Sequence, residues 1–376
     1  MTTRSLGGLA LAGGLACVAT PAFAQEPPVA SAPRGWHAAV AAEGGVERNP
    51  RFQTPSDSSA TVSRVRATLG GLTRVGRTQV RVTGDGAVAR YGNVADLDRT
   101  TYTGALDVER AFTPRLTGRA GALLRTTSSS EATAAVAGPL LPEAIARTRA
   151  ASGAVAYRTS PRTTVTASAD AASTRYDEAA LAGGWTSAGH LGVTRRTGPA
   201  SSLGGALDVQ HATAGDRPQT VVGSAADWST AIGRVQLRVA AGASALLGTS
   251  QTIVRPVGDA SAAWRVRAGT IALHAGRTVA PAAGIGRVLA TDQAGVLFDR
   301  TATSHLALHA ALDGAWSADP SDPSLRLDAT TATTALRWSL GPTFRLDLGA
   351  FLRQRTQSGS TILNHGFTFG VGRTLF

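Results

Sequence analysis

Apolar and polar residues alternate along almost the whole of this chain of 376 residues, and the alternation restricts the fold more than any other feature. In the segment 343–353, apolar residues occupy every second position from Phe344 to Leu352, and charged residues such as Arg345 lie between them. A strand with this pattern has one apolar and one polar face, whereas the same spacing leaves no apolar stripe on a helix. The pattern therefore predicts an all-β protein.

The alternation is divided by turn-forming residues into about eighteen segments, with sixteen as the alternative count. Most of these segments are longer than the roughly 9–11 residues that a tilted strand needs to cross a bilayer. So many hairpin-linked strands also favour a closed barrel over an open sheet, whose edges invite aggregation. We therefore expect a transmembrane antiparallel up-and-down β-barrel. The expected strands cover residues 35–46, 59–72, 77–91, 99–112, 115–127, 146–158, 162–176, 184–196, 201–213, 218–229, 233–248, 256–267, 270–279, 287–299, 303–317, 324–340, 343–355 and 361–376.

The connections between these segments alternate between short and long. Short turns carry Gly or Pro, as in Arg74-Val75-Gly76 and Gly341-Pro342, and such residues suit tight turns. Short periplasmic turns and longer extracellular loops are typical of outer-membrane barrels. An even number of strands then places both termini on the periplasmic side. The longer polar loops are expected at 47–58, 91–98, 128–145 and 318–324.

The N-terminus has the features of a secretory signal. Arg4 is followed by a short apolar run and then by a small-residue site that ends at Ala24. We expect residues 1–24 to be the signal peptide, 25–34 a short periplasmic segment and 35–376 the barrel. Cys17, the single cysteine, would leave with the signal, so the mature chain would contain no disulfide. Export through the inner membrane and barrel patterning together predict location in the outer membrane.

The basic residues are all arginines, 37 in number, and they give a formal charge of +12. They are spread along the chain, and with an export signal this pattern argues against nucleic acid as a partner. The lack of lysine excludes P-loop and Schiff-base lysine chemistry. We find no catalytic motif and expect no enzyme, no metal and no cofactor. His305 and His309 would lie about 13 Å apart on a strand, too far to share an ion, so lumen lining is the better interpretation.

Aromatic residues fall near the expected ends of the strands. Two bands of Trp and Tyr at the membrane interfaces are typical of barrels in a bilayer. We expect the inner band to contain Trp36, Trp228, Trp264 and Trp338, and the outer band to contain Tyr91, Tyr102, Tyr176, Trp185 and Trp316.

Charged residues fill the face opposite the apolar one. An arginine on the lipid face at the bilayer midplane costs about 2–4 kcal/mol, so these residues are expected to point into the lumen. Two roles stay open: a salt-bridged, hydrated wall, or a basic ring that favours anions. The expected pore-lining residues are Arg64, Arg66, Arg81, Arg119, Arg125, Arg238, Arg337, Arg345, Arg353, Asp107 and Asp347, joined by Asp85, Glu109, Asp208 and Asp313.

The longest expected loop, 128–145, is the third outer loop. It contains Glu131 and Glu143, and its Leu140-Leu141-Pro142 could pack against the wall. Our hypothesis is that this loop narrows the pore, with the two glutamates facing inward arginines. A disordered outer loop is the alternative.

Two parts of the sequence resemble known outer-membrane proteins. The terminal Phe376, at the end of an amphipathic strand, resembles the signal read by the barrel-assembly machinery, although Phe367 and Phe369 are out of phase with it. The segments 44–50 and 276–281 resemble pieces of the β-barrel porins of proteobacteria, some of which are associated with exopolysaccharide or capsule systems.

The resemblance implies passive diffusion of small polar or anionic solutes. The alternatives are a barrel of an exopolysaccharide export or envelope-assembly system, and an outer-membrane hydrolase. The partners implied are outer-membrane lipid, lipopolysaccharide and the assembly machinery. A homo-oligomer is left open.

Overall fold

The computed structural model describes residues 35–50, 59–128, 144–177, 181, 183–214, 217–247, 252–282, 286–357 and 360–375. These residues form eighteen strands and one short 3-10 helix, η1 (Ala95–Leu97). The strands are β1 (Gly35–Arg48), β2 (Ser59–Val75), β3 (Thr78–Tyr91), β4 (Arg99–Ala111), β5 (Leu116–Ser128), β6 (Ile145–Ser160), β7 (Thr163–Tyr176), β8 (Gly184–Arg196), β9 (Ser201–Ala214), β10 (Arg217–Ile232), β11 (Val235–Leu247), β12 (Ile253–Val266), β13 (Gly269–Ala282), β14 (Arg287–Thr301), β15 (Leu306–Asp319), β16 (Asp322–Ser339), β17 (Phe344–Gln357) and β18 (Ser360–Thr374).

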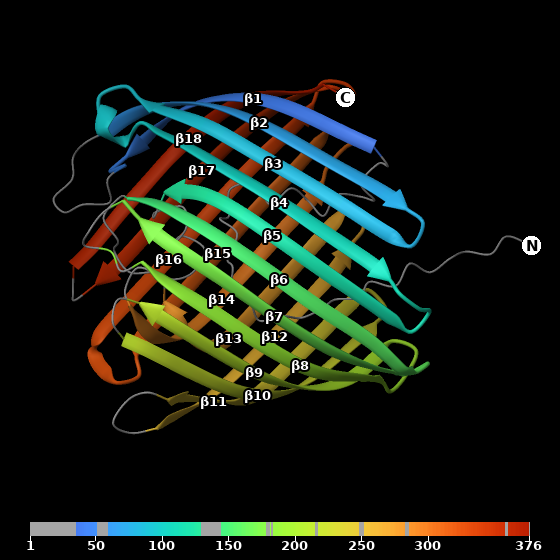
Figure 1. Cartoon of the computed structure of the whole chain (residues 1–376). Coiled ribbons are helices and arrows are strands. Elements are labelled where there is room, and N and C mark those ends of the chain that lie inside the picture. Colours follow the sequence, from blue (N-terminus) through green and yellow to red (C-terminus); the bar gives the residue numbers. More distant parts are fainter. Residues whose placement is uncertain are drawn as a thin grey trace, which may run out of the picture.

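Each strand pairs antiparallel with its neighbours in the sequence, and β18 pairs with β1 to close the sheet into a barrel (Figure 1). The closing register runs from Ala39 opposite Thr374 to Arg48 opposite His365. Closure leaves no open edge in an eighteen-stranded sheet. The expected fold, an up-and-down barrel of about eighteen strands, is confirmed.

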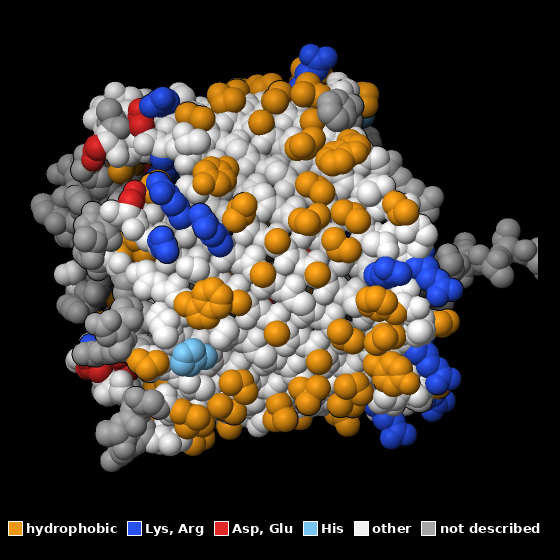
Figure 2. All heavy atoms as spheres, in the orientation of Figure 1, with side chains coloured by type: hydrophobic (Ala, Val, Ile, Leu, Met, Phe, Trp, Pro, Cys, Tyr) orange, Lys and Arg blue, Asp and Glu red, His pale blue; other side chains and the backbone are white. Residues whose placement is uncertain are grey.

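The outward face of the wall is apolar because alternate residues of every strand point away from the lumen. Val65 on β2 and Leu273 on β13 are examples, with 61% and 52% of their surfaces exposed. Figure 2 shows apolar side chains distributed across most of the visible wall. Exposed apolar surface on this scale is not stable in water, so the wall faces lipid.

The turns near the N-terminal end of the barrel are tight. Gly76 and Gly233 hold φ values of 58° and 60° in two of them, and glycine adopts this left-handed region without steric cost. β1 begins at this end, on the right of Figure 1. The longer connections lie at the other end, as expected for the extracellular side.

Most outward aromatics lie where the sequence pattern placed them, but two do not. Trp36, Trp264 and Trp185 are about half exposed on the outward face. Tyr91 is buried and Tyr176 lies on the inward face of β7, because the register pairs Tyr91 with inward Val62 and Tyr176 with inward Ala146. The expectation that these two tyrosines belong to the outer band was therefore wrong.

A second correction concerns the loop expected at 318–324. β15 continues to Asp319 and β16 starts at Asp322, so only a two-residue turn joins them. Asp319 and Asp322 both accept hydrogen bonds from Ser321 or Ser324 within this turn. The Asp-Pro repeats therefore cap a hairpin and do not form a long loop.

The sequence left open which face of the last strand meets lipid, and the exposed fractions of its side chains identify that face. Phe367, Phe369 and Val371 are between 41% and 53% exposed and point to the lipid. Phe376, the signal segment 1–24 and the segment 25–34 lie outside the described residues. None of the helices in the described ranges is long and apolar enough to cross a membrane.

Candidate functional site

The register assigns the charged residues of the wall to the lumen. Residues directly opposite in paired strands share a face, and Val65, which is exposed to lipid, separates Arg64 from Arg66 on β2. The same alternation, followed through the pairings, places all of the following on the inward face: Arg64, Arg66, Arg81, Arg119, Arg125, Arg238, Arg337, Arg345, Arg353, Asp107 and Asp347. Their role in conduction stays a prediction.

Several of these arginines are paired with acids on neighbouring strands. Nε of Arg66 lies 2.5 Å from Oδ2 of Asp85 on β3. Farther around the wall, Nη2 of Arg119 on β5 donates to Asp107 on β4 at 2.7 Å. These pairs line one side of the barrel with a ladder of alternating charge.

The ladder continues across the strands that close the barrel. Asp347 on β17 accepts a hydrogen bond from Nε of Arg337 at 2.8 Å, and its carboxylate lies 3.2 Å from Nε of Arg345. β18 presents Gly370 and Gly372 at this level, and a Cβ on Gly372 would lie 2.8 Å from Nε of Arg345. The glycines therefore leave room for long charged side chains to lie flat against the wall.

Other strands of the lumen wall carry aspartate–histidine pairs. Nδ1 of His190 on β8 lies 2.7 Å from Asp208 on β9, and Nδ1 of His309 on β15 lies 2.7 Å from Asp299 on β14. His274 on β13 lies 3.5 Å from Asp313 on β15, across the intervening strand. In the closed sheet order, β8, β13 and β14 lie across the lumen from β17, β4 and β5, whereas β15 adjoins β16 of the arginine ladder. The sequence pattern did not reveal the aspartate–histidine pairs because the partners belong to different strands.

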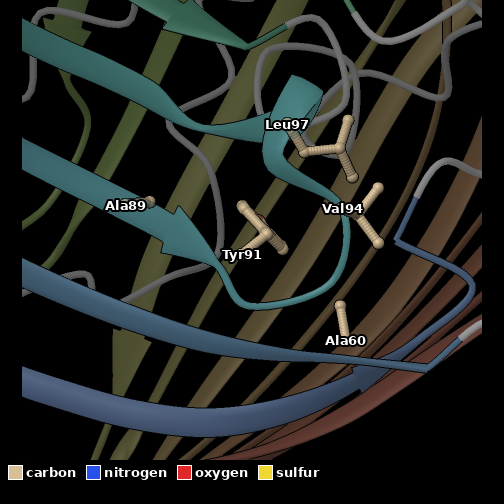
Figure 3. Close-up of a cluster of buried hydrophobic side chains, with 5 residues drawn as sticks. All are labelled: Ala60, Ala89, Tyr91, Val94 and Leu97. Atoms are coloured by element: carbon tan, nitrogen blue, oxygen red, sulfur yellow. The ribbon is translucent and has the colours of Figure 1, made fainter.

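The connection between β3 and β4 folds inward at the extracellular end. Tyr91, Val94 and Leu97 pack with Ala60 and Ala89 on the inner wall (Figure 3). The carboxylate of Asp98, the residue after η1, accepts the backbone N–H of Tyr91 at 2.7 Å. This loop holds the buried tyrosine inside the barrel and covers part of the lumen there.

A second inward element is the extracellular end of the β13–β14 hairpin. The β12–β13 ladder stops at Gly258 opposite Arg277, whereas β13 and β14 stay paired up to Ala282 opposite Arg287. Beyond Arg277 the hairpin packs Val288, with its neighbour Val279, against the inward side chains Val221 of β10 and Leu246 of β11. Because these four side chains are at most 6% exposed, the hairpin end lies inside the wall and narrows the pore.

The expected constriction residues Glu131 and Glu143 lie outside the described residues. The first described residue after them, Ala144, is buried with Leu181 against Tyr176. Within the described ranges, no three His, Cys, Asp or Glu side chains are grouped closely enough to hold a metal ion.

The closed wall, the apolar outward face and the charged lumen define a transmembrane β-barrel of the outer-membrane type. No protein-family model and no curated protein matches the chain. Among solved structures it is similar to OccK11 (OpdR) of Pseudomonas aeruginosa, with 12% identity, a TM-score of 0.48 and coverage of 91% of this chain and 98% of that chain.

Two further similar structures come from the same organism. OccK2 (OpdF) in complex with glucuronate has 12% identity, a TM-score of 0.48 and coverage of 91% and 98% of the two chains. The outer membrane protein opdK has 12% identity, a TM-score of 0.46 and coverage of 90% and 98%. Similarity at this level does not transfer a substrate or a binding residue, so the function must be argued from this chain's own lumen.

Proposed function

We propose that the protein is a porin-like channel through which small polar solutes, anions among them, diffuse passively across the outer membrane. The observation that carries the proposal is the charged lumen wall, which combines arginine–aspartate pairs such as Arg66–Asp85 with aspartate–histidine pairs such as Asp208–His190. A wall of fixed charges keeps a lumen hydrated and sets which ions enter it.

The chemistry of the wall favours solutes that carry both hydroxyl groups and a carboxylate. Guanidinium groups bind carboxylates through paired hydrogen bonds, and the carboxylates and imidazoles of the wall accept hydrogen bonds from hydroxyls. The inward β3–β4 loop and β13–β14 hairpin restrict the opening to small solutes.

The test is conductance of the refolded protein in a planar bilayer. We expect discrete channel steps, and we expect added hydroxy acids to interrupt the current more than uncharged sugars of similar size. Absence of channel steps, with circular dichroism showing a folded barrel, would contradict the proposal.

Experiments on the same refolded protein distinguish two alternative functions. An exopolysaccharide export barrel would conduct only with its partner proteins, and no described contact supports this role. A hydrolase would need a serine hydrogen-bonded to a histidine, and among the described residues no such bond is found: His190 and His309 bond to aspartates and His211 bonds to Thr220. Turnover of an ester substrate that a serine-directed inhibitor abolishes would favour the hydrolase.

A further inference from the structure

Three arginines form a cluster on the lipid-facing side of the wall. Arg147 and Arg149 are on β6, and Arg175 is on β7; all three are exposed. They share the outward face with Val155 and Tyr157 of β6, which are nearly half exposed. Figure 2 shows a group of basic side chains on this wall toward the left, at the extracellular end.

The cluster lies at the level of the outer membrane interface. Arg147 is the third residue of β6, and Arg175 is the last but one of β7. Ser173, which pairs with Arg149 on one side, pairs with outward Trp185 on the other. An arginine on the lipid face costs about 0–1 kcal/mol near an interface, so the cluster is tolerated at this depth and can reach headgroups.

The arrangement brings like charges together without compensation. Arg147 and Arg175 stand directly opposite each other in the β6–β7 ladder, where like charges repel. Within the described part of the chain, none of the three arginines has a hydrogen bond or an ion pair. Asp177, the residue after β7, accepts the backbone N–H of Ile145 at 2.6 Å.

Other outward arginines at the same end of the barrel are neutralised by aspartates. Arg277 forms a two-pronged pair with Asp292, with both bonds at 2.6 Å. Arg90 pairs with Asp98 at 2.8 Å, and Arg326 with Asp328 at 3.3 Å. The cluster on β6 and β7 therefore differs from these paired arginines, because no side chain of the described residues supplies its counter-charge.

We propose that Arg147, Arg149 and Arg175 bind the phosphate groups of a lipopolysaccharide molecule in the outer leaflet. Arginine binds phosphate through paired, charge-assisted hydrogen bonds. A phosphate between Arg147 and Arg175 would turn their repulsion into a shared attraction. The cluster stands on the outside of the wall, so this site is independent of the solute that crosses the lumen.

The test compares two double variants that remove the same charge. R147Q/R175Q alters the cluster, whereas R195Q/R300Q removes two exposed arginines from the opposite, periplasmic end. Binding of fluorescently labelled lipopolysaccharide to each refolded barrel is measured, with dephosphorylated lipopolysaccharide and phosphatidylglycerol vesicles as competitors. Conductance and circular dichroism show that each variant is folded.

We expect R147Q/R175Q to lose at least tenfold in affinity, R195Q/R300Q to match the native protein, and dephosphorylated lipopolysaccharide to compete poorly. Equal affinities of the two variants would overturn the proposal. So would competition by phosphatidylglycerol at the same lipid-phosphate concentration as intact lipopolysaccharide, because the cluster would then bind any anionic lipid.

Discussion

The side-chain amide of Asn364 on β18, the last strand, donates to Oε1 of Glu47 on β1, the first strand, at 2.7 Å. The same nitrogen donates to the carbonyl of Asn49 at 2.9 Å, and Nδ2 of Asn49 donates back to the carbonyl of Leu363 at 3.0 Å. Asn49 holds a φ of 57°, a left-handed conformation that asparagine tolerates. The seam that closes the barrel is therefore fastened at its extracellular end by reciprocal asparagine bonds.

Replacing Asn364 by Asp is expected to weaken this seam. The side chain is fully buried, and the change would place a carboxylate against Glu47 in place of a donor, at a cost of about 1–3 kcal/mol. The measurement is urea-induced unfolding of the barrel in detergent. In the double variant E47Q/N364D a glutamine amide can donate to the new carboxylate, so we expect part of the stability to return. No recovery in the double variant would show that the two side chains do not interact directly.

The Arg66–Asp85 pair allows a direct test of lumen charge. Asp85→Asn removes the partner of Arg66 and adds net positive charge, whereas Arg66→Gln does the reverse. We expect the chloride-to-potassium permeability ratio to rise about twofold in the first variant and fall about twofold in the second, a modest change because salt screens single charges. Reversal potentials in a salt gradient measure the ratio. Arg195→Gln, on the outward face, is the matched control and should leave it unchanged.

The packing of the β13–β14 hairpin predicts a change in channel size. Val288 is 2% exposed between Val221 and Leu246, so Val288→Asp would bury a charge in an apolar cluster. We expect the hairpin to leave the inner wall and the single-channel conductance to rise at least twofold. Val288→Leu, which keeps the apolar packing, should conduct as the native protein does. Native conductance in the aspartate variant would mean that the hairpin does not narrow the pore.

The loop containing Glu131 and Glu143 carries a separate prediction. If it forms the constriction, deleting residues 132–143 will raise conductance and weaken cation attraction at the mouth. Single-channel recording of the deletion variant provides the measurement, and unchanged conductance would leave the β13–β14 hairpin and the β3–β4 loop as the narrowing elements.

The β3–β4 loop should respond to acid. The N–H of Tyr91 and the Arg90 guanidinium both bind the Asp98 carboxylate and hold its pKa below the usual 3.8. A lowered pKa means that the contribution to stability is complete above 3.8 and is lost as the pH falls through the lowered value. We expect amide exchange of Tyr91 to stay slow from pH 7 to 5 and to accelerate only below pH 3.8, relative to its intrinsic rate. In Asp98→Asn this acid-dependent step should be missing.

The expected outer aromatic band shows where the sequence pattern and the tertiary structure disagree. Tyr102 and Tyr91 both stand near the extracellular ends of strands in the sequence, yet Tyr102 is half exposed and Tyr91 is buried. Their difference depends on which face of the strand each residue occupies and on a loop that turns inward over Tyr91. Position along the chain alone does not reveal which face a residue occupies or whether a loop covers it.

The sequence by itself determined the closed barrel, an approximate number of strands and the face on which charge lies, because alternation with period two is a local property fixed by the geometry of one strand. Only the tertiary structure decided which charges meet, that histidines pair with aspartates on β8–β9 and β13–β15, and that the β13–β14 hairpin folds inside. These contacts join strands such as β10 and β14, which are far apart in the chain and brought together only by the register and curvature of the closed sheet.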